Sequence, residues 1–279
     1  MLIATWNVNS IRSRLNQVGE WLNEVKPDLL CIQETKVEDH LFPKEFFEER
    51  GYQVSCYGQK SYNGVALISM HPIEDIKLGL ESELSNNSIA KELDQQKRII
   101  TALIQGIRVV NVYVPNGSDL ASDKYIYKIK WLKCLSNYLQ IEAKKDYPIC
   151  LLGDFNIALE DSDIYNPQRS SGGIMASQLE RETLKEALFK SNLKDIFRVF
   201  EKGSQHWSWW NYRHSSWEKN NGWRIDHIYL SEELTEISKG CSIHKEVRGN
   251  EKPSDHAPVM VDLEWPPNEE EIEEEIDFF

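Results

Sequence analysis

The stretch "YPICLLGDFNIA" (residues 147–158) joins an apolar run to a polar turn, and this pattern decides the fold class. Residues 149–152 are uniformly apolar, as in a strand that other layers cover on both faces. Similar runs occur at 2–8, 28–33, 64–69, 98–104, 107–114, 224–230 and 258–264. Segments with helical periodicity lie between some of these runs, so the chain is predicted to be an α/β protein.

Three segments predict helices. In residues 15–25 and 124–145, apolar side chains recur along one face: Leu15, Val18, Leu22 and Val25 in the first segment, and Ile126, Ile129, Leu132, Leu135 and Leu139 in the second. Residues 177–189 open with Ser177 and Glu180 at the spacing of a capping box, in which each side chain bonds the other's backbone N–H. Residues 1–265 contain no internal repeat or linker, which predicts one domain.

The C-terminal segment 266–279 differs in composition from the rest. "PPNEEEIEEEIDFF" carries seven acidic residues and no basic one, which predicts a disordered acidic tail. The five cysteines form no CxxC pair and indicate free thiols in a reducing compartment. Neither a signal peptide nor an apolar run of roughly 18 residues is evident, so we expect a cytoplasmic protein with no membrane partner.

The formal net charge of −13 argues against a nucleic-acid partner, because phosphates repel an acidic surface. The seven acids of the tail contribute part of that charge, but the body of the chain is acidic as well. Any contact with phosphates must therefore be local or carried by metal ions.

Polar side chains stand where the predicted strands end. Asn7 ends the first, Glu34 follows the second, Tyr113 ends the fifth, and Asp154 and Asn156 follow the sixth; Asp226 lies in the seventh, and Asp255 and His256 precede the last. Strand ends commonly converge on one rim of a sheet, where binding sites lie. These residues are therefore candidates for a shared site.

Their chemistry suits a metal-dependent phosphodiester hydrolase. Glu34 and Asp255 are hard oxygen ligands and Asn7 is a neutral one, which favours Mg²⁺ or Mn²⁺ over Zn²⁺. Asp154 and Asn156 are two positions apart, so in an extended segment they face the same side and could hold a water. Metal, positioned water and charge stabilisers are the parts such an enzyme needs.

Asp255 and His256 are neighbours, but successive side chains of an extended strand point to opposite faces. They are therefore not expected to bond each other, and Asp226 is the best carboxylate to orient His256. Each candidate also has an ordinary interpretation. An Asp after a strand is commonly a turn residue or helix cap, a lone His is commonly packed or solvated, and Tyr113 could belong to the core.

Nine segments together resemble the exonuclease III family of AP endonucleases and 3′→5′ exodeoxyribonucleases, within the endonuclease/exonuclease/phosphatase superfamily. In the family's order they are "WNVNSIR" (6–12), "QETK" (33–36), "YGQKSYNGVAL" (57–67), "KRIITA" (97–102), "YVPNG" (113–117), "GDFNIA" (153–158), "WSWWNYR" (207–213), "GWRIDHI" (222–228) and "EKPSDHAPV" (251–259). They span the catalytic domain expected at 1–265. The resemblance implies a two-layer β-sandwich of mixed sheets flanked by helices, the four-layer αββα fold of DNase I-like proteins.

The family implies Mg²⁺- or Mn²⁺-dependent hydrolysis of DNA. The bonds cleaved lie 5′ to abasic sites or at the 3′ ends of duplex DNA, and removal of 3′ blocking groups accompanies this activity in base-excision repair. Double-stranded DNA with abasic sites or 3′ ends is the implied partner. We also expect a monomer that is associated with the nucleoid in a bacterium.

The resemblance assigns roles to matching residues. Glu34 is the implied main metal ligand, with Asn7 and Asp255 close to the metal. Asp154 and Asn156 are the implied water-positioning pair, and His256 paired with Asp226 contacts the scissile phosphate, which Tyr113 and Asn116 flank. Asp154, Asn156 and His256 complete the set expected near the metal. Whether Asp154 or His256 takes the proton stays open.

DNA contacts are implied for a basic and an aromatic group of residues: Arg12, Lys60, Arg98, Asn116, Trp209, Arg213, Trp223 and Lys252. Alternation in "WSWWNYR" predicts Trp207 and Trp209 on one face and Trp210 on the other. In the family the matching aromatics line a pocket for a flipped-out abasic sugar, a role we expect for Trp209, and we expect Trp207 in the core. The basic residues predict a locally positive rim, which would allow this acidic chain to bind DNA phosphates despite its net charge.

Three residues depart from the family pattern. Trp223 stands where a smaller apolar residue is usual, Asn211 replaces a more usual Asp, and His227 is no family hallmark. Two other functions stay open, another phosphodiesterase or phosphatase of the superfamily and a non-catalytic DNA-binding module.

Overall fold

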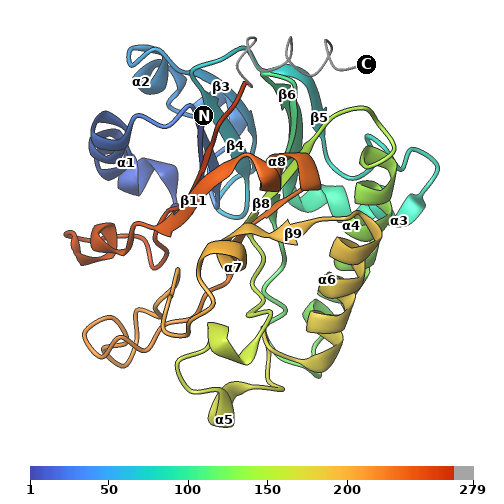
Figure 1. The fold of residues 1–279 in the computed structure, drawn as a ribbon, viewed down its shortest axis with the longest axis vertical. Coiled ribbons are helices and arrows are strands. Elements are labelled where there is room, and N and C mark those ends of the chain that lie inside the picture. Colours follow the sequence, from blue (N-terminus) through green and yellow to red (C-terminus); the bar gives the residue numbers. More distant parts are fainter. Residues whose placement is uncertain (267–279) are drawn as a thin grey trace, which may run out of the picture.

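Two six-stranded sheets stack face to face in the computed structural model, which describes residues 1–266 (Figure 1). The first sheet runs in the order β11 (Ser238–Ile243), β12 (Val259–Leu263), β1 (Leu2–Asn7), β2 (Leu29–Gln33), β4 (Val65–Ser69) and β3 (Gln53–Tyr57). The second runs in the order β5 (Glu74–Leu78), β6 (Ile99–Ile104), β7 (Ile107–Tyr113), β8 (Ile149–Asp154), β10 (Asp226–Leu230) and β9 (Lys194–Asp195). The predicted β-sandwich of mixed sheets is therefore confirmed.

Helices cover the outer faces of both sheets. The first sheet carries α1 (Ile11–Val25) and α2 (Lys44–Glu48), and the second carries α3 (Ser88–Leu93), α4 (Asp123–Glu142) and α6 (Gln178–Lys190). Shorter helices lie in the connections: α5 (Pro167–Ser170), α7 (Ile196–Phe200), α8 (Glu232–Glu236) and the 3₁₀ turns Asp39–Leu41, Asp94–Gln96, Asp161–Asp163 and Lys245–Gly249. One apolar cluster fills the space between the sheets, and one lies under each helical layer, which gives the predicted αββα layers.

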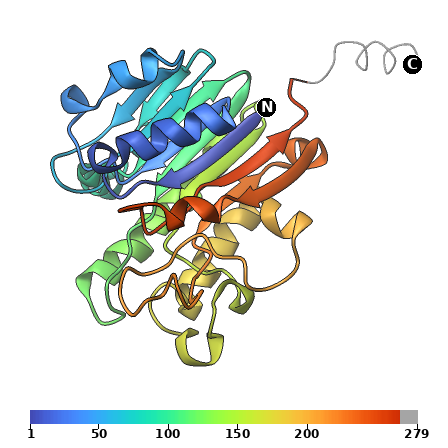
Figure 2. The same ribbon diagram turned by 90° about the vertical axis from the view of Figure 1, so that its left-hand side faces the viewer.

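The sheet pairing determines where the site lies. β1 pairs parallel with β2, and β7 pairs parallel with β8, so the ends of these four strands meet at one end of the sandwich. β10 and β12 run antiparallel to β8 and β1, so they begin where the others end. The long loops around α5 and residues 205–222 gather at the same end, opposite to the N-terminus (Figure 2).

The helix predictions hold except at one position. Ser177 and Glu180 form both bonds of the capping box, and the periodic face of α1 is buried or packed against the core. Ile126 is 53% exposed, whereas its neighbours Tyr125 and Tyr127 pack against the apolar cluster that contains Ile129. Within residues 1–266 no helix is long and apolar enough to cross a membrane. The predicted disordered tail falls, apart from Pro266, outside the described residues.

Candidate active site

The amide of Asn7 joins two carboxylates at the centre of the strand ends. Its Nδ2 donates to Glu34 Oε1 and to Asp154 Oδ2, at 2.9 Å each, although these residues come from different sheets. Asn7 and Asp154 are buried, and Asn7 lies beside Gln33 in the β1–β2 register. Three of the predicted residues therefore form one contact group across the gap between the sheets.

Glu34 follows β2 in a left-handed backbone conformation, with φ of 51°, which is uncommon for a residue other than glycine. The ammonium of Lys36 lies 2.8 Å from Glu34 Oε2 and also donates to the side chain of Asn9. Burial alone would raise the pKa of Glu34, but the Lys36 charge and the Asn7 amide hold that pKa below its ordinary value. Glu34 is thus an ionised carboxylate at neutral pH.

Asp154 and Asn156 do contact each other, but not through the extended segment that the sequence predicted. Asn156 has φ of 49°, and its backbone N–H donates to Asp154 Oδ1 at 2.8 Å, which closes a tight turn. Its side-chain Nδ2 donates to Asp154 Oδ2 at 3.2 Å, and its Oδ1 accepts from Asn116 Nδ2 at 2.9 Å. The turn, rather than strand alternation, brings the pair together.

His256 is bonded to Asp226 and not to its neighbour Asp255. Its Nδ1 lies 2.9 Å from Asp226 Oδ2, and Ser208 Oγ donates to the same oxygen at 2.6 Å. The other ring nitrogen, Nε2, faces Asp154 Oδ2 at 3.8 Å. The predicted His256–Asp226 pairing is therefore present, and the imidazole lies between two carboxylates.

This buried row shifts the pKa values of its members. Burial would lower the pKa of His256, but Asp226 and Asp154 raise it to about 10, so the ring is an imidazolium at neutral pH. Burial raises the pKa of Asp154 to about 7, with the His256 charge opposing the rise and Asp226 adding to it. The row therefore contains a fixed cation beside a carboxyl that titrates near neutrality.

Asp255 lies at the side of this group. Its Oδ1 accepts from Asn9 Nδ2 at 2.9 Å, and its Oδ2 accepts from Trp209 Nε1 at 3.0 Å. In the described part of the chain it makes no hydrogen bond to Glu34 or Asn7; Asn9 and Lys36 connect it to Glu34 instead. Glu34, Asn7 and Asp154 are therefore in direct contact with one another through the Asn7 amide, whereas Asp255 reaches Glu34 only through Asn9 and Lys36.

The donor set fits a divalent cation of the Mg²⁺ or Mn²⁺ kind. Glu34 and Asp154 supply carboxylate oxygens on either side of one amide, and the potential ligand atoms of Asp154, Asp226 and His256 lie within 4.8 Å of one another. No cysteine takes part in that cluster. Because Nδ1 of His256 is held by Asp226 and the ring is protonated, the carboxylates are better suited than the imidazole to hold a cation.

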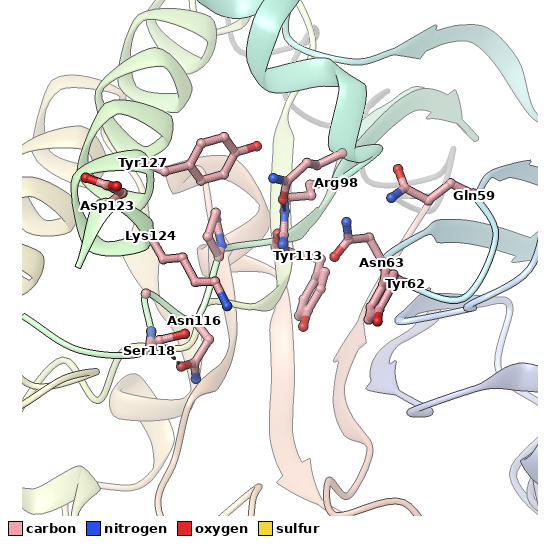
Figure 3. A pocket seen from close by; sticks show the side chains of 13 residues that line it. Gln59, Tyr62, Asn63, Arg98, Tyr113, Asn116, Ser118, Asp123, Lys124 and Tyr127 are labelled. Atoms are coloured by element: carbon pink, nitrogen blue, oxygen red, sulfur yellow. Dashed lines mark hydrogen bonds between the residues drawn. The ribbon is translucent and has the colours of Figure 1, made fainter.

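A cavity of about 510 Å³ opens beside Tyr113 (Figure 3). Arg98 stacks on the Tyr113 ring with 4.6 Å between guanidinium carbon and ring centroid, and it donates to the Tyr113 carbonyl. Lys124 and Asn116 reach in from the α4 side, opposite Asn63. Burial and the Glu34 charge raise the pKa of the Tyr113 hydroxyl, which is therefore available as a donor.

A second cavity of about 550 Å³ has a wall of two tryptophans, Trp209 and Trp223. Their backbones pair with each other, and their rings meet edge to face with centroids 6.4 Å apart. Asn211, another departure from the family pattern, lines the same cavity, whereas His227 is fully buried beside Arg224.

The alternation predicted for "WSWWNYR" is wrong. Trp207 and Trp210 both lie in the core under α1, because the backbone bends at Ser208, and Trp209 turns to the other side. Trp207 is in the core as expected. The bend has a cause in the site itself, since the Ser208 hydroxyl is bonded to Asp226 and to the backbone of residues 225 and 226.

The predicted basic residues divide into two groups. Arg12, Lys60, Arg213 and Lys252 are exposed on loops or on the surface of α1, while Arg98 is only 9% exposed and its contacts support Tyr113. Sequence reasoning missed Asn9 and Lys36, which connect Asp255 to Glu34. Asn9 and Lys36 are in the matched segments, two positions after Asn7 and Glu34, which is the signal that could have identified them.

Comparison with known proteins supports the fold and identifies the family. The model of the endonuclease/exonuclease/phosphatase family matches residues 4–256. Exodeoxyribonuclease III of Haemophilus influenzae is 34% identical over 94% of this chain and 100% of its own length. Among solved structures, the 3′ phosphatase NExo from Neisseria, bound to a product DNA hairpin, has a TM-score of 0.89 at 36% identity and covers 95% of this chain and 100% of its own. An AP endonuclease from Archaeoglobus fulgidus has a TM-score of 0.86 at 38% identity, with coverage of 94% and 99%.

Proposed function

This chain belongs to the endonuclease/exonuclease/phosphatase family, and on that premise we propose that it is a metal-dependent DNA-repair nuclease. It hydrolyses the phosphodiester bond 5′ to an abasic site, and it removes nucleotides and blocking groups from 3′ ends of duplex DNA. The observation that carries the proposal is the buried row of Asp226, His256 and Asp154, with the carboxylate of Glu34 joined to it through Asn7.

The pKa values favour one assignment of the proton transfer. His256, with a pKa raised to about 10, carries its proton already and cannot accept another, whereas Asp154 titrates near neutrality. Asp154 and Asn156 therefore hold the attacking water, and Asp154 takes its proton. His256 donates from Nε2 to a non-bridging oxygen of the scissile phosphate and stabilises the charge that develops there.

The remaining residues hold the phosphate and the metal. Tyr113 and Asn116 flank the phosphate, with the Tyr113 hydroxyl as the donor. Glu34 and Asp154 would hold the divalent cation, with the Asn7 amide joining their carboxylates and Asp255 beside them. A bound divalent cation supplies positive charge that reduces the repulsion between water and phosphate. The same arrangement acts on a phosphodiester within a DNA strand and on a phosphomonoester at a 3′ end of DNA, because both present a tetrahedral phosphate to the same donors.

The aromatic cavity provides selectivity for abasic DNA. A sugar without a base costs least to extrude from the helix, and the crossed rings of Trp209 and Trp223 offer it an apolar wall, with the Trp209 ring next to that of His256. A relative that is named a 3′ phosphatase and one named an AP endonuclease share this fold closely, which supports both activities. Cytoplasmic location near the nucleoid and a monomeric state complete the proposal.

A defined duplex tests the proposed function. A labelled oligonucleotide duplex with one abasic site is incubated with Mg²⁺ or Mn²⁺, and the products are resolved on a denaturing gel. A single incision product indicates AP endonuclease action, and a ladder indicates exonuclease action. The intact duplex and Asp154→Asn, which is expected to bind DNA without cleaving it, are the controls. Cleavage of inositol phosphates or RNA in preference to DNA would favour another hydrolase of the superfamily, and no cleavage with either metal would refute the enzymatic function.

The exposed basic residues predict strongly salt-dependent binding. Arg12, Lys60, Arg213 and Lys252 are exposed and lie in or beside the segments that carry the site residues, so we propose that they form a local positive rim on a chain with net charge −13. The affinity of Asp154→Asn for the duplex is expected to fall steeply between low and physiological salt. Salt-independent binding would contradict the positive rim without bearing on the cleavage chemistry.

A further inference from the structure

A lysine ammonium lies fully buried behind two residues of the active site. Lys128 is on α4, and its Nζ donates to the backbone carbonyl of Asn156 at 2.7 Å and to that of Asn116 at 3.2 Å. Its third donor goes to Glu180 Oε1 at 2.5 Å. All three N–H groups are therefore used, and two of them hold the backbone of the amide pair that flanks Asp154.

The partner carboxylate extends this network to a third loop. Glu180, at the start of α6, accepts from the backbone N–H of Met175 and of Ser177, at 3.1 and 3.0 Å. Met175 Sδ in turn accepts from Asn116 Nδ2, and Met175 lines the aromatic cavity. One buried ion pair thus connects the segments after β7 and β8 with the loop that precedes α6.

Core packing does not explain this arrangement. A buried lysine–glutamate pair loses the hydration of both ions, and well-packed apolar residues of similar volume often serve stability equally well. Burial does lower the pKa of Lys128, with the Glu180 charge opposing that effect. What an apolar pair could not do is fix two loop carbonyls at defined positions, one of them on Asn156 with its left-handed backbone.

We propose that Lys128 is a positioning residue for the hydrolysis reaction, which holds Asn116 and Asn156 by their backbone carbonyls so that Asp154 and its water are correctly placed. This proposal rests on the function proposed above. Lys128 does not contact the substrate, and Glu180 acts with it as the counter-charge that keeps the ammonium in place. Errors of about 1 Å in such a pair are enough to lower a rate about 100-fold.

Single-turnover cleavage of the abasic duplex tests the role of Lys128. Lys128→Met keeps the length of the side chain and removes the donors; it is expected to lower the cleavage rate about 10- to 100-fold, with duplex affinity changed less than about threefold. Lys128→Met combined with Glu180→Gln leaves no unpaired charge, so it is expected to regain thermal stability and to stay slow. Lys133→Met removes an exposed charge from the same helix and is expected to behave like the wild type.

A double-mutant cycle distinguishes positioning from general support of the fold. If Lys128 acts through the amide pair, then Lys128→Met lowers the rate much less in an Asn116→Ala background than in the wild type. Independent, multiplicative effects would overturn the proposal, as would a folded single or double variant with a rate within about twofold of the wild type. A double variant that does not fold would also overturn it, because the pair would then be a requirement of the fold. Cleavage by the wild type in the same assay separates these results from a failure of the proposed function.

Discussion

Replacing Asp226 by asparagine tests the buried row most directly. Asp226 accepts from His256 Nδ1 at 2.9 Å and from Ser208 Oγ at 2.6 Å, and an asparagine can keep this shape while it loses the charge. Burial lowers the pKa of His256, but the Asp226 carboxylate, followed by Asp154, raises that pKa from its ordinary 6.5 to about 10. Asp226→Asn is therefore expected to remove the imidazolium at neutral and alkaline pH.

The size of the effect follows from the protonated fraction. In the variant, burial is opposed only by Asp154 and Asp255, and the pKa of His256 is expected to fall to about 7 or below. At pH 8 about a tenth or less of the rings then carry a proton, which alone lowers the rate about tenfold. Loss of such a charge donor from every molecule would cost about 100- to 1,000-fold, but the protonated fraction stays active, so we expect a reduction of about tenfold at pH 8.

Single-turnover cleavage at saturating Mg²⁺, measured from pH 6 to pH 8, gives the diagnostic result. The wild-type ring stays protonated throughout this range, because the pKa of His256 is about 10. The variant ring is protonated only at the acidic end, so the ratio of wild-type to variant rate should grow about tenfold as the pH rises. Asp262→Asn, which removes an exposed carboxylate on β12, is the matched control.

Two results would refute this reasoning. A constant ratio between pH 6 and pH 8 would mean that the charge of His256 plays no part in the rate. A variant within about twofold of the wild type at pH 8 would mean that Asp226 does not hold the reacting geometry. Unchanged duplex affinity is expected in either case, because Asp226 is fully buried and contacts no exposed surface.

Four further predictions concern single residues. Burial raises the pKa of Asp154 to about 7, so kcat/KM should rise with pH up to about 7 as the base loses its proton, and higher Mg²⁺ should move the inflection in the pH–rate profile to lower pH. Glu34→Gln should raise the half-saturating Mg²⁺ concentration at least about tenfold in a metal titration of cleavage, with duplex affinity unchanged. Trp223→Ala should open the cavity wall and lower the preference for abasic over intact duplex about tenfold, measured as the ratio of their kcat/KM values. Arg224→Met should remove the buried guanidinium that pairs with Asp195 and Asp163, leave Asp163 with Arg198 as its remaining guanidinium partner, and lower the free energy of unfolding by about 3 kcal/mol or more in denaturant titrations.

The sequence predicts the inner strands of both sheets and misses the edges. β3, β5, β9 and β11, which carry no continuous apolar run, are the four outermost strands. A strand between two others and between two layers must be apolar on both faces, whereas an edge strand has exposed positions that weaken the pattern. Pattern reasoning therefore finds the strands that hold the site, because those strands are central.

The sequence predicts those site residues whose positions depend only on where the strands end. Parallel pairing of β1 with β2 and of β7 with β8 places Asn7, Glu34 and Asp154 at one rim, as the sequence suggested. The Asn9, Lys36 and Asn156 contacts depend on left-handed turns with φ of 47°, 54° and 49°, which apolar periodicity does not encode. The burial of Lys128 could not be predicted from the sequence for another reason: a lysine on a helix is ordinarily exposed to solvent.

The adjacency of Asp255 and His256 shows why distance along the chain is a poor guide to pairing. The segment before β12 bends at Asp255 and is bridged to Trp209 at His256. It turns the Asp255 carboxylate toward Asn9 and Trp209 and the His256 ring toward Asp226, which lies 30 positions earlier. Backbone contacts hold this register: Ser254 Oγ donates to the Asn7 carbonyl and Trp6 Nε1 to that of His256. Because side chains alternate, a shift of one residue would exchange the two faces, and the imidazole would lose both carboxylates. The register of this segment must therefore be fixed for the proposed chemistry. Strand β1 fixes it through Trp6 and Asn7, and the side chain of Asn7 also joins Glu34 to Asp154.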